Sequence, residues 1–494
     1  MSQTTEQKPA CPAGRYETVI GLEVHLQLST RTKIFCGCAN VFGRDPNTQT
    51  CPVCLGLPGT LPVLNKMALE YALKIAIALN CQINSVIKFD RKNYYYPDLP
   101  KGYQISQYDK PVACDGHVWM TNADGQERKI NIKRAHLEED AGKLIHDERA
   151  NCSFVDYNRT GTPLLEIVSE PDLRSPQEAY DYLQALKLTL EYLRVSDCDM
   201  EKGSLRCDAN VSIREAGAKT FGTKTELKNM NSFKAVRTAL EFEEKRQREV
   251  VSSGGRIVQE TRLWSEEKGT TIAMRSKEEA HDYRYFPEPD LVPFDIDEAL
   301  IEEVRRSIPE LPRQKFERFV GEYGLSGYDA RIIVEDQHIA HFFEACAKLY
   351  ADTKKICNWL NGPLLQELNA RKMDFKDIKI MPEDLIAIMR KVDESVLSNL
   401  SAKETLKQVL DTGKDVAAVI RDAGLAQVSD SSALEGIVDE LIREHQNVVG
   451  QIREGKASAI GFLVGQAMRK SQGKANPKMI GEIIQRKLAD TSPF

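Results

Sequence analysis

The alternation of apolar and polar residues near the start of the chain predicts a β-strand with one polar face. In the run 21–28, four apolar residues alternate with Glu23, His25 and Gln27. Because side chains of a strand point alternately to its two faces, the apolar set enters a core and the polar set lies on the opposite face. A carboxylate, an imidazole and an amide on one face can hold a metal or a substrate. An ordinary half-solvated strand, however, shows the same alternation.

Four later segments with β-type sequence also carry several polar side chains, many of them carboxylates. They cover residues 136–143, 161–168, 205–213 and 224–228. Their carboxylates include Glu138, Glu139, Glu166, Asp208 and Glu226. If these strands pair, four or five carboxylates and one histidine come together. A solvated sheet face usually shows scattered Thr and Lys instead, so the recurrence favours a functional site.

The hydrophobic pattern changes near residue 297, and the chain as a whole reads as an α+β protein. Before that point β-type alternation dominates, with helical periodicity at 64–80, 176–194 and 232–251. The segment 281–293 carries three prolines within seven residues, which excludes a continuous helix and marks a boundary. Beyond it, apolar residues recur at spacings of three and four, which predicts helices that include 298–308, 337–352 and 382–392. A break at 411–415 begins a small helical tail.

Length and composition set broad limits on the protein. A chain of 494 residues suggests about three domains, and 41% hydrophobic with 28% charged residues is a normal globular balance. No run of about 18 apolar residues exists, and the first fifteen residues resemble neither a secretory signal nor a transit peptide. We therefore expect a cytoplasmic protein with no membrane span and a short disordered tip at residues 1–15.

Four of the twelve cysteines form two close pairs. They are Cys36, Cys38, Cys51 and Cys54, with twelve residues between the pairs. Two thiolate pairs joined by a short loop match a tetrahedral zinc knuckle, and four thiolates leave no open position for water. Such a zinc ion would therefore be structural. Four free thiols buried in a Gly/Pro-rich loop are the alternative.

Charge is distributed unevenly along the chain. The net charge is −6, yet residues 451–494 contain eight Lys/Arg and three Asp/Glu. A basic terminal segment on an acidic chain suggests that it holds a polyanion such as nucleic acid. A solvated helix face is the alternative interpretation.

Neither a Walker loop nor a dinucleotide-binding motif is present, so phosphate binding would fall to a metal and to basic side chains. The segment 89–107 interleaves tyrosines with Arg and Lys. Aromatic rings beside cations suit stacking on a nucleic-acid base or on an adenine ring. A packed tyrosine-rich loop would show the same composition.

Seven sequence blocks, taken in order, resemble the B subunit of the tRNA-dependent amidotransferase. They are GLEVH at 21–25, FDRKNY at 89–94, YQISQ at 103–107, HLEEDAGK at 136–143, NRTGTPLLEIVSEPD at 158–172, GSLRCDAN at 203–210 and DYRYFPEPD at 282–290. That enzyme is a heterotrimer which converts Glu-tRNA(Gln) to Gln-tRNA(Gln) and Asp-tRNA(Asn) to Asn-tRNA(Asn). The resemblance runs from about Tyr16 to the last helix.

The resemblance implies a domain organisation. Residues 16–297 would form a β-rich, cradle-shaped kinase domain that contains the zinc knuckle at 36–54. Residues 298–411 would form a helical domain, and residues 412–494 a small helical tail domain, for which the basic charge predicts tRNA binding.

The resemblance also implies a mechanism and roles for individual residues. In this family ATP phosphorylates the side-chain carboxylate, ammonia displaces the phosphate, and Mg²⁺ neutralises charge on the phosphoryl oxygens. The implied Mg²⁺ ligands are His25, Glu138 and Glu166. Positions beside the metal or along the path of ammonia fall to Glu23, Glu139, Asp208 and Glu226. Candidate contacts to the nucleotide, phosphate or aminoacyl group are Lys92, Tyr94, Lys101, Arg159 and Arg206.

The source of ammonia is not evident in the sequence, because no glutaminase motif is recognisable. The resemblance implies an amidase-like A subunit as the source, and a small C subunit that clasps the pair. Further implied partners are tRNA(Gln), tRNA(Asn) and the misacylating aminoacyl-tRNA synthetase. Only some members of the family carry the four cysteines, so the chemistry does not require zinc.

Two functions of other kinds remain open from the residues alone. A metal-dependent phosphodiesterase would use the same carboxylates to hold two ions about 4 Å apart. A non-catalytic RNA-binding scaffold would use the basic tail and dock partners on the polar sheet face. The sequence does not decide which of the two tRNAs is the physiological substrate.

Overall fold

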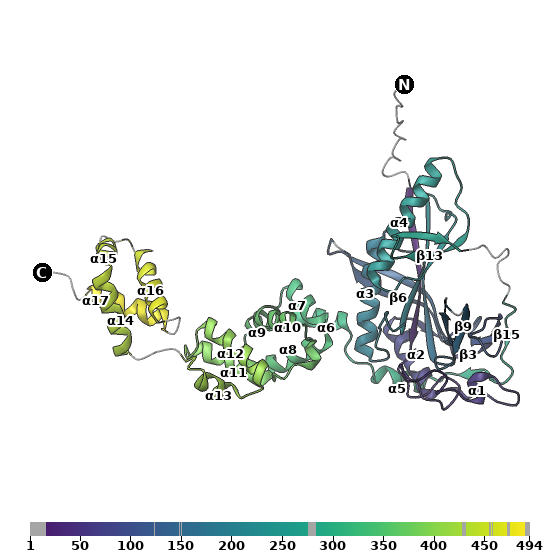
Figure 1. Cartoon of the computed structure of the whole chain (residues 1–494), viewed down its shortest axis with the longest axis horizontal. Helices are drawn as coiled ribbons and strands as arrows, with labels where there is room; N and C mark the ends of the chain where they lie inside the picture. The colour runs from purple at the N-terminus through teal and green to yellow at the C-terminus, as the bar shows by residue number, and fades with distance from the viewer. Residues whose placement is uncertain are drawn as a thin grey trace, which may run out of the picture. The chain divides into compact units, whose positions relative to one another are not determined.

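A computed structural model describes most of the chain. The described residues are 16–122, 124–147, 149, 151–274, 283–426, 431–453, 456, 458–471 and 475–489. The predicted disordered tip at 1–15 lies outside them. The chain divides into two compact units, Met1–Pro312 and Arg313–Phe494. The protein is α+β, with a first unit built on a large sheet and a second unit made of helices (Figure 1).

The first unit is organised around a nine-stranded sheet. Its strand order is β14-β13-β12-β11-β1-β10-β7-β6-β2, and each neighbouring pair is antiparallel except β12 and β13, which are parallel. In that order the strands are Thr270–Ala273, Glu260–Ser265, Thr225–Lys228, Leu205–Glu215, Tyr16–Gln27, Pro163–Ser169, Glu127–Glu139, Ala113–Thr121 and Gln82–Ile83. The predicted polar-faced strand is β1, which lies in the centre.

Three helices cover the apolar face of this sheet. They are α2 (Lys66–Ala78), α3 (Pro176–Leu193) and α4 (Phe233–Ser252), and they confirm the three helices predicted before residue 297. Their apolar sides share one core with the buried residues Leu22, Val24 and Leu26 of β1, and Figure 1 shows α3 and α4 along one side of the sheet. The interleaved residues of β1 are half-buried on the opposite face.

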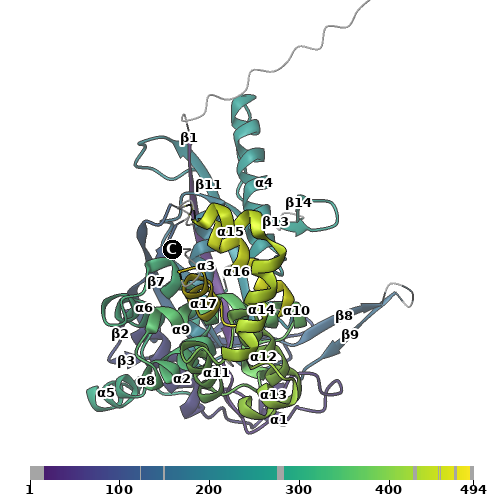
Figure 2. The same ribbon diagram turned by 90° about the vertical axis from the view of Figure 1, so that its left-hand side faces the viewer.

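Three small sheets and a short helix also belong to the first unit. The three-stranded sheet has the order β15-β4-β5, and the other two sheets are the pairs β16-β3 and β8-β9. Their strands are β3 (Val86–Ile87), β4 (Asp90–Asn93), β5 (Tyr103–Ser106), β8 (Lys143–Asp147), β9 (Cys152–Asp156), β15 (Phe286–Pro287) and β16 (Phe294–Asp295). The β8–β9 hairpin projects from the sheet (Figure 2), and α1 (Pro52–Leu55) lies in the cysteine-containing loop.

Helix α5 (Glu298–Arg306) follows the proline-rich segment and belongs to the first unit, because Ile301 and Val304 pack into its core. The second unit begins with α6 (Pro312–Gly321). Its next elements are α7 (Gly327–Val334), α8 (Gln337–Leu349), α9 (Thr353–Trp359), the π-helix η1 (Leu360–Leu364), α10 (Leu365–Arg371), the 3₁₀ turn η2 (Phe375–Asp377), α11 (Pro382–Asp393), α12 (Asn399–Thr412) and α13 (Val416–Asp422). The helices predicted over 298–308, 337–352 and 382–392 are therefore found as α5, α8 and α11. The proposed domain boundaries at 297 and 411 stay predictions.

The last four helices share a core of their own. They are α14 (Ser431–Glu444), α15 (Gln446–Arg453), α16 (Ser458–Lys470) and α17 (Pro477–Ala489). Leu434 and Val438 of α14 pack with Leu463 of α16 and Ile480 of α17, all fully buried. Among the described helices, none combines the length and the apolar character needed to cross a membrane.

Candidate functional site

Three side chains with metal-binding atoms converge on the polar face of the large sheet. His25 on β1, Glu138 on β7 and Glu166 on β10 place one ligand atom each within 4.8 Å of the others. His25 Nε2 lies 3.6 Å from Glu166 Oε2 and 3.8 Å from Glu138 Oε1. They converge because His25 stands opposite Glu166 and β10 pairs on its other side with β7. Two carboxylates and an imidazole at this spacing suit a divalent cation, and Mg²⁺ in particular prefers oxygen ligands.

His136 belongs to the same cluster, although no role was predicted for it. Its Nε2 lies 3.0 Å from Glu166 Oε2 and 3.8 Å from Glu138 Oε2. Burial disfavours the imidazolium, but the charges of the two glutamates outweigh burial and raise the pKa of His136 to about 9. Burial would raise the pKa of both carboxyls, yet the neighbouring histidines hold it below the ordinary value. A sequence signal existed, because His136 is two positions before Glu138 in one strand and shares its face.

A second polar centre surrounds Asp140, for which no role was predicted either. Gln27 Nε2 donates to Asp140 Oδ2 at 2.7 Å, and Arg206 Nη2 lies 3.1 Å from Oδ1. Burial opposes ionisation, but the charges of Arg206 and Arg159 lower the pKa of Asp140. Arg159 uses Nε and Nη2 to donate to the carbonyls of the two residues after Asp140, at 2.9 and 2.6 Å. Arg159 therefore holds the loop, whereas Arg206 stands opposite His25 in the sheet.

A third group of polar side chains continues across β1, β11 and β12. Asn210 Nδ2 donates to Glu23 Oε1 at 2.9 Å, and Lys228 Nζ lies 2.6 Å from Asp208 Oδ2 and 3.0 Å from Glu226 Oε1. Burial and the charges of neighbouring carboxylates raise the pKa of Glu23. The structure thus brings Glu23, Asp208 and Glu226 together, and it adds Lys228 and Asn210. Lys228 could have been found from the sequence because it shares a strand face with Glu226.

Glu139 is not brought to the histidine–glutamate cluster. It follows Glu138 directly in β7, and consecutive side chains of a strand point to opposite faces. Its Oε1 accepts hydrogen bonds from Lys101 Nζ and, at 2.9 Å, from the Ile105 amide. Glu139 and Lys101 line a cavity of about 170 Å³ that also borders the cysteine loop. The predicted site residues Glu139 and Lys101 are therefore partners of each other beside that loop.

Tyrosines that belong to the tyrosine-rich segments of the sequence border the histidine–glutamate cluster. Lys92 Nζ lies 4.8 Å from the ring centroid of Tyr283, whose ring meets that of Tyr94 edge-on at 5.9 Å. The rings of Tyr108 and Tyr285 stack with centroids 4.5 Å apart. Burial, together with the charge of Glu138 nearby, raises the pKa of both Tyr94 and Tyr285. Lys92 and Tyr94 thus belong to an aromatic border of the site.

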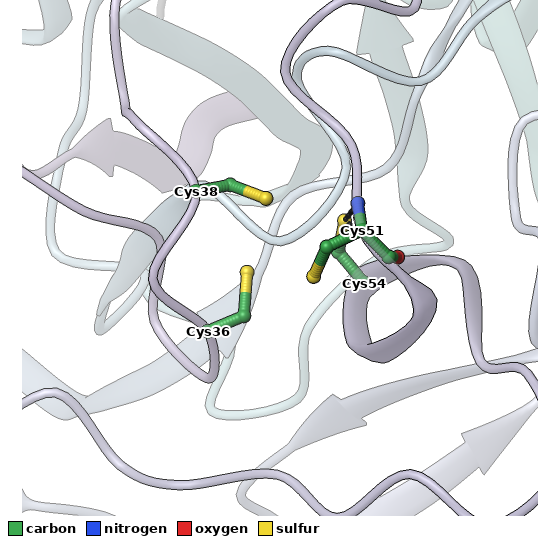
Figure 3. Close-up of side chains that lie close together, drawn as sticks. All are labelled: Cys36, Cys38, Cys51 and Cys54. Atoms are coloured by element: carbon green, nitrogen blue, oxygen red, sulfur yellow. Dashed lines mark hydrogen bonds between the residues drawn. The ribbon is translucent and has the colours of Figure 1, made fainter.

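The four cysteines of the two predicted pairs lie together in the loop between β1 and α2. Their Sγ atoms are all within 4.8 Å of one another, and the side chains point toward one another (Figure 3). A hydrogen bond from Cys36 lowers the pKa of the Cys54 thiol to about 4 against the effect of burial, with help from the Cys51 amide and the charge of Lys33. Four sulfurs at this spacing could hold a metal ion such as zinc.

The fold combines a central sheet that has an acidic, histidine-containing face with a separate helical unit. Two family models match these parts of the chain. Residues 18–302 match the family described as the GatB/GatE catalytic domain. Residues 341–488 match the family described as the GatB domain.

Close relatives identify the family more narrowly. The chain is 52% identical over 96% of its length to the B subunit of the aspartyl/glutamyl-tRNA(Asn/Gln) amidotransferase of Carboxydothermus hydrogenoformans, and the match covers 99% of that protein. It is 53% identical over 96% of its length to the protein of the same name from Moorella thermoacetica, all of which is covered. The chain therefore belongs to the family of amidotransferase B subunits, which confirms the resemblance seen in the sequence.

Proposed function

We propose that this chain activates the side-chain carboxylate of Glu-tRNA(Gln), Asp-tRNA(Asn) or both for conversion to the amide. ATP phosphorylates the carboxylate to an acyl phosphate and ADP, and ammonia then displaces inorganic phosphate. The observation that carries this proposal is the convergence of His25, Glu138 and Glu166 on one sheet face. Membership of the family of amidotransferase B subunits supports it.

His25, Glu138 and Glu166 would hold Mg²⁺, which when bound neutralises charge on the phosphoryl oxygens. His136 positions Glu166 from a distance of 3.0 Å. Arg206 offers a cation beside the cluster, since it stands opposite His25 and is held by Asp140. The tyrosines that border the cluster exclude water, which protects an acyl phosphate from hydrolysis.

Glu23, Asp208 and Glu226 would form the route by which ammonia arrives. Their carboxylates lie side by side on three neighbouring strands, and Lys228 bridges two of them. Carboxylates along such a route can accept hydrogen bonds from ammonia and can take up the proton of any ammonium, so that ammonia reaches the acyl phosphate. The proposed source is an amidase-like A subunit, with a small C subunit as the third component. The proposed region for the nucleotide is the border formed by Lys92 and Tyr94.

The tail formed by α14–α17 is our proposed contact to tRNA, but its charge is more balanced than the basic segment suggested. Acidic residues of α14 pair with Lys470 at 2.9 Å and with Lys487 at 2.6 Å, and Arg486 forms an ion pair with Glu435. Residues 412–494 contain eleven Lys/Arg and ten Asp/Glu. Arg469 and Lys478 are exposed and form no ion pair with the described residues, so they remain available for phosphate.

Replacing both Arg469 and Lys478 by glutamine is expected to weaken tRNA binding and to flatten its salt dependence. Each phosphate interaction that is removed should lower the slope of log affinity against log salt by about one. Filter binding of misacylated tRNA between low and physiological salt measures this slope.

Lys470→Gln is the matched control, because Lys470 is already paired with Glu444. Removing the tail from residue 431 onwards should have a larger effect and leave glutamine hydrolysis by the partner intact. Unchanged affinity and salt dependence in the double variant and in the truncated chain would exclude the tail as the tRNA contact.

A further inference from the structure

Lys33 is a charged side chain buried beside the four-cysteine centre. It is completely shielded from solvent. Its Nζ donates to the Gln49 carbonyl at 2.7 Å and to the Tyr157 carbonyl at 3.4 Å, and it lies 3.7 Å from Cys54 Sγ. An ammonium group has three N–H donors, so these three acceptors use all of them.

The environment of Lys33 is unusual because it holds no carboxylate partner. Among the described residues, no Asp or Glu lies within ion-pair distance of its Nζ. A buried ammonium is costly unless an anion compensates it. Both carbonyl partners are neutral, whereas the Cys54 sulfur can carry a full negative charge. The buried lysine is therefore best accounted for if the cysteine centre is anionic.

A four-thiolate zinc centre is anionic in this way. Zn²⁺ carries two positive charges and four thiolates carry four negative ones, which leaves a double negative charge beside the buried Lys33. Without zinc, Lys33 would face at most the single negative charge of a Cys54 thiolate. Groups in contact with metal ligands commonly set the strength of metal binding.

We infer that Lys33 is the counter-ion of the four-cysteine zinc centre and strengthens zinc binding through Cys54 without itself being a ligand. This inference rests on the proposal that the centre holds zinc. It bears on the two interpretations of the cysteines, since a zinc centre would give the buried ammonium a stronger anionic partner than a single Cys54 thiolate.

The same side chain connects the cysteine loop to the polar sheet face. Through Tyr157, Lys33 contacts the segment that carries Arg159, and the Asn158 side chain accepts from the Gln49 amide at 2.8 Å. Gly161 lies beside both residues, since an added Cβ would be in van der Waals contact with Cys54 Cβ and Lys33 Cδ at 3.5 Å, and its φ of +82° favours glycine. The zinc centre would therefore help to position the segment that carries Arg159, whose side chain binds the loop after Asp140.

Replacing Lys33 by methionine removes the charge and keeps most of the side-chain volume. The zinc affinity of the purified full-length chain, measured by competition with a chromogenic chelator, should fall by about 10- to 100-fold. Lys66→Met is the control, because the Lys66 side chain is 79% exposed, and it should leave the affinity unchanged. Lys33→Gln, which keeps hydrogen-bond donors without the charge, should behave like the methionine variant.

If Lys33 only supported the fold, added zinc would not compensate for its loss, whereas a counter-ion role predicts that it does. If the methionine variant folds poorly, excess zinc should restore its melting temperature toward that of the wild type, since binding by mass action compensates for a reduced affinity. Failure of zinc to restore it would overturn the inference, as would an unchanged zinc affinity in folded Lys33→Met or Lys33→Gln. A wild-type chain that binds no zinc would overturn both the zinc site and the role of Lys33.

Discussion

Glu138→Gln and Glu166→Gln are each expected to slow ATP-dependent amidation by on the order of 100-fold or more. Each substitution removes one of the two carboxylates that converge with His25 within 4.8 Å. Glutamine keeps the shape of the side chain but loses the charge that would bind Mg²⁺. The rate of Gln-tRNA or Asn-tRNA formation in the reconstituted complex, at saturating ATP and ammonia, measures the effect.

Two controls separate loss of chemistry from loss of structure. Glu201→Gln changes an exposed carboxylate in the turn before β11 and should keep full activity. Misacylated tRNA should bind to the glutamine variants within a few-fold of the wild-type affinity, because the proposed tRNA contacts lie elsewhere. Melting curves are needed for Glu166→Gln in particular, since this change leaves the buried His136 without its nearest anion. Full activity in either folded variant would disprove the assignment.

Cys51→Ser is expected to remove zinc and to lower the thermal stability of the first unit substantially. The wild-type chain should contain one zinc ion per molecule, because four sulfurs within 4.8 Å supply a complete tetrahedral ligand set. Binding free energy at such a site contributes to folding, because the unfolded chain offers no preformed site. Elemental analysis gives the metal content, and calorimetry gives the melting temperature with and without a chelator.

Cys152→Ser is the matched control, because Cys152 is a free cysteine exposed on the β8–β9 hairpin. It should change neither the zinc content nor the melting temperature. Amidation by Cys51→Ser should fall only as far as the loop that carries Arg159 is displaced. If wild-type protein purified without chelator contained no zinc, the four cysteines would have to be interpreted as free thiols.

Strand periodicity predicts which side chains lie on the polar face of the sheet. Glu23 and His25 lie on the polar face of β1 as their alternation with buried leucines and valine indicated. The order of the strands could not be predicted, because β1 pairs with segments roughly 140 and 190 residues later in the chain. For this reason His25 could be linked to Glu166 only through the resemblance to a family.

The differences between the predicted site residues and those that the structure brings together have local physical causes. Glu138 and Glu139 were assigned to one site, but neighbours in a strand face opposite ways, and Glu139 binds Lys101 instead. His136 and Asp140 were given no role, although both stand in the same sequence block. Residues 451–494 are strongly basic by themselves, but acidic partners of their cations lie earlier in the chain, on α14.

The fate of the carboxylate oxygen tests the central claim most directly. Glu-tRNA(Gln) with ¹⁸O in both side-chain carboxylate oxygens is converted by the complex with the proposed A and C subunits, ATP and glutamine. If the carboxylate is phosphorylated and ammonia then displaces phosphate, every inorganic phosphate released should carry one ¹⁸O and the amide should retain the other. Phosphate without ¹⁸O in a reaction that still forms the amide would contradict the account. Cleavage of the RNA without ATP would identify a phosphodiesterase instead. Binding of the RNA without any metal-dependent turnover would indicate a non-catalytic RNA-binding scaffold.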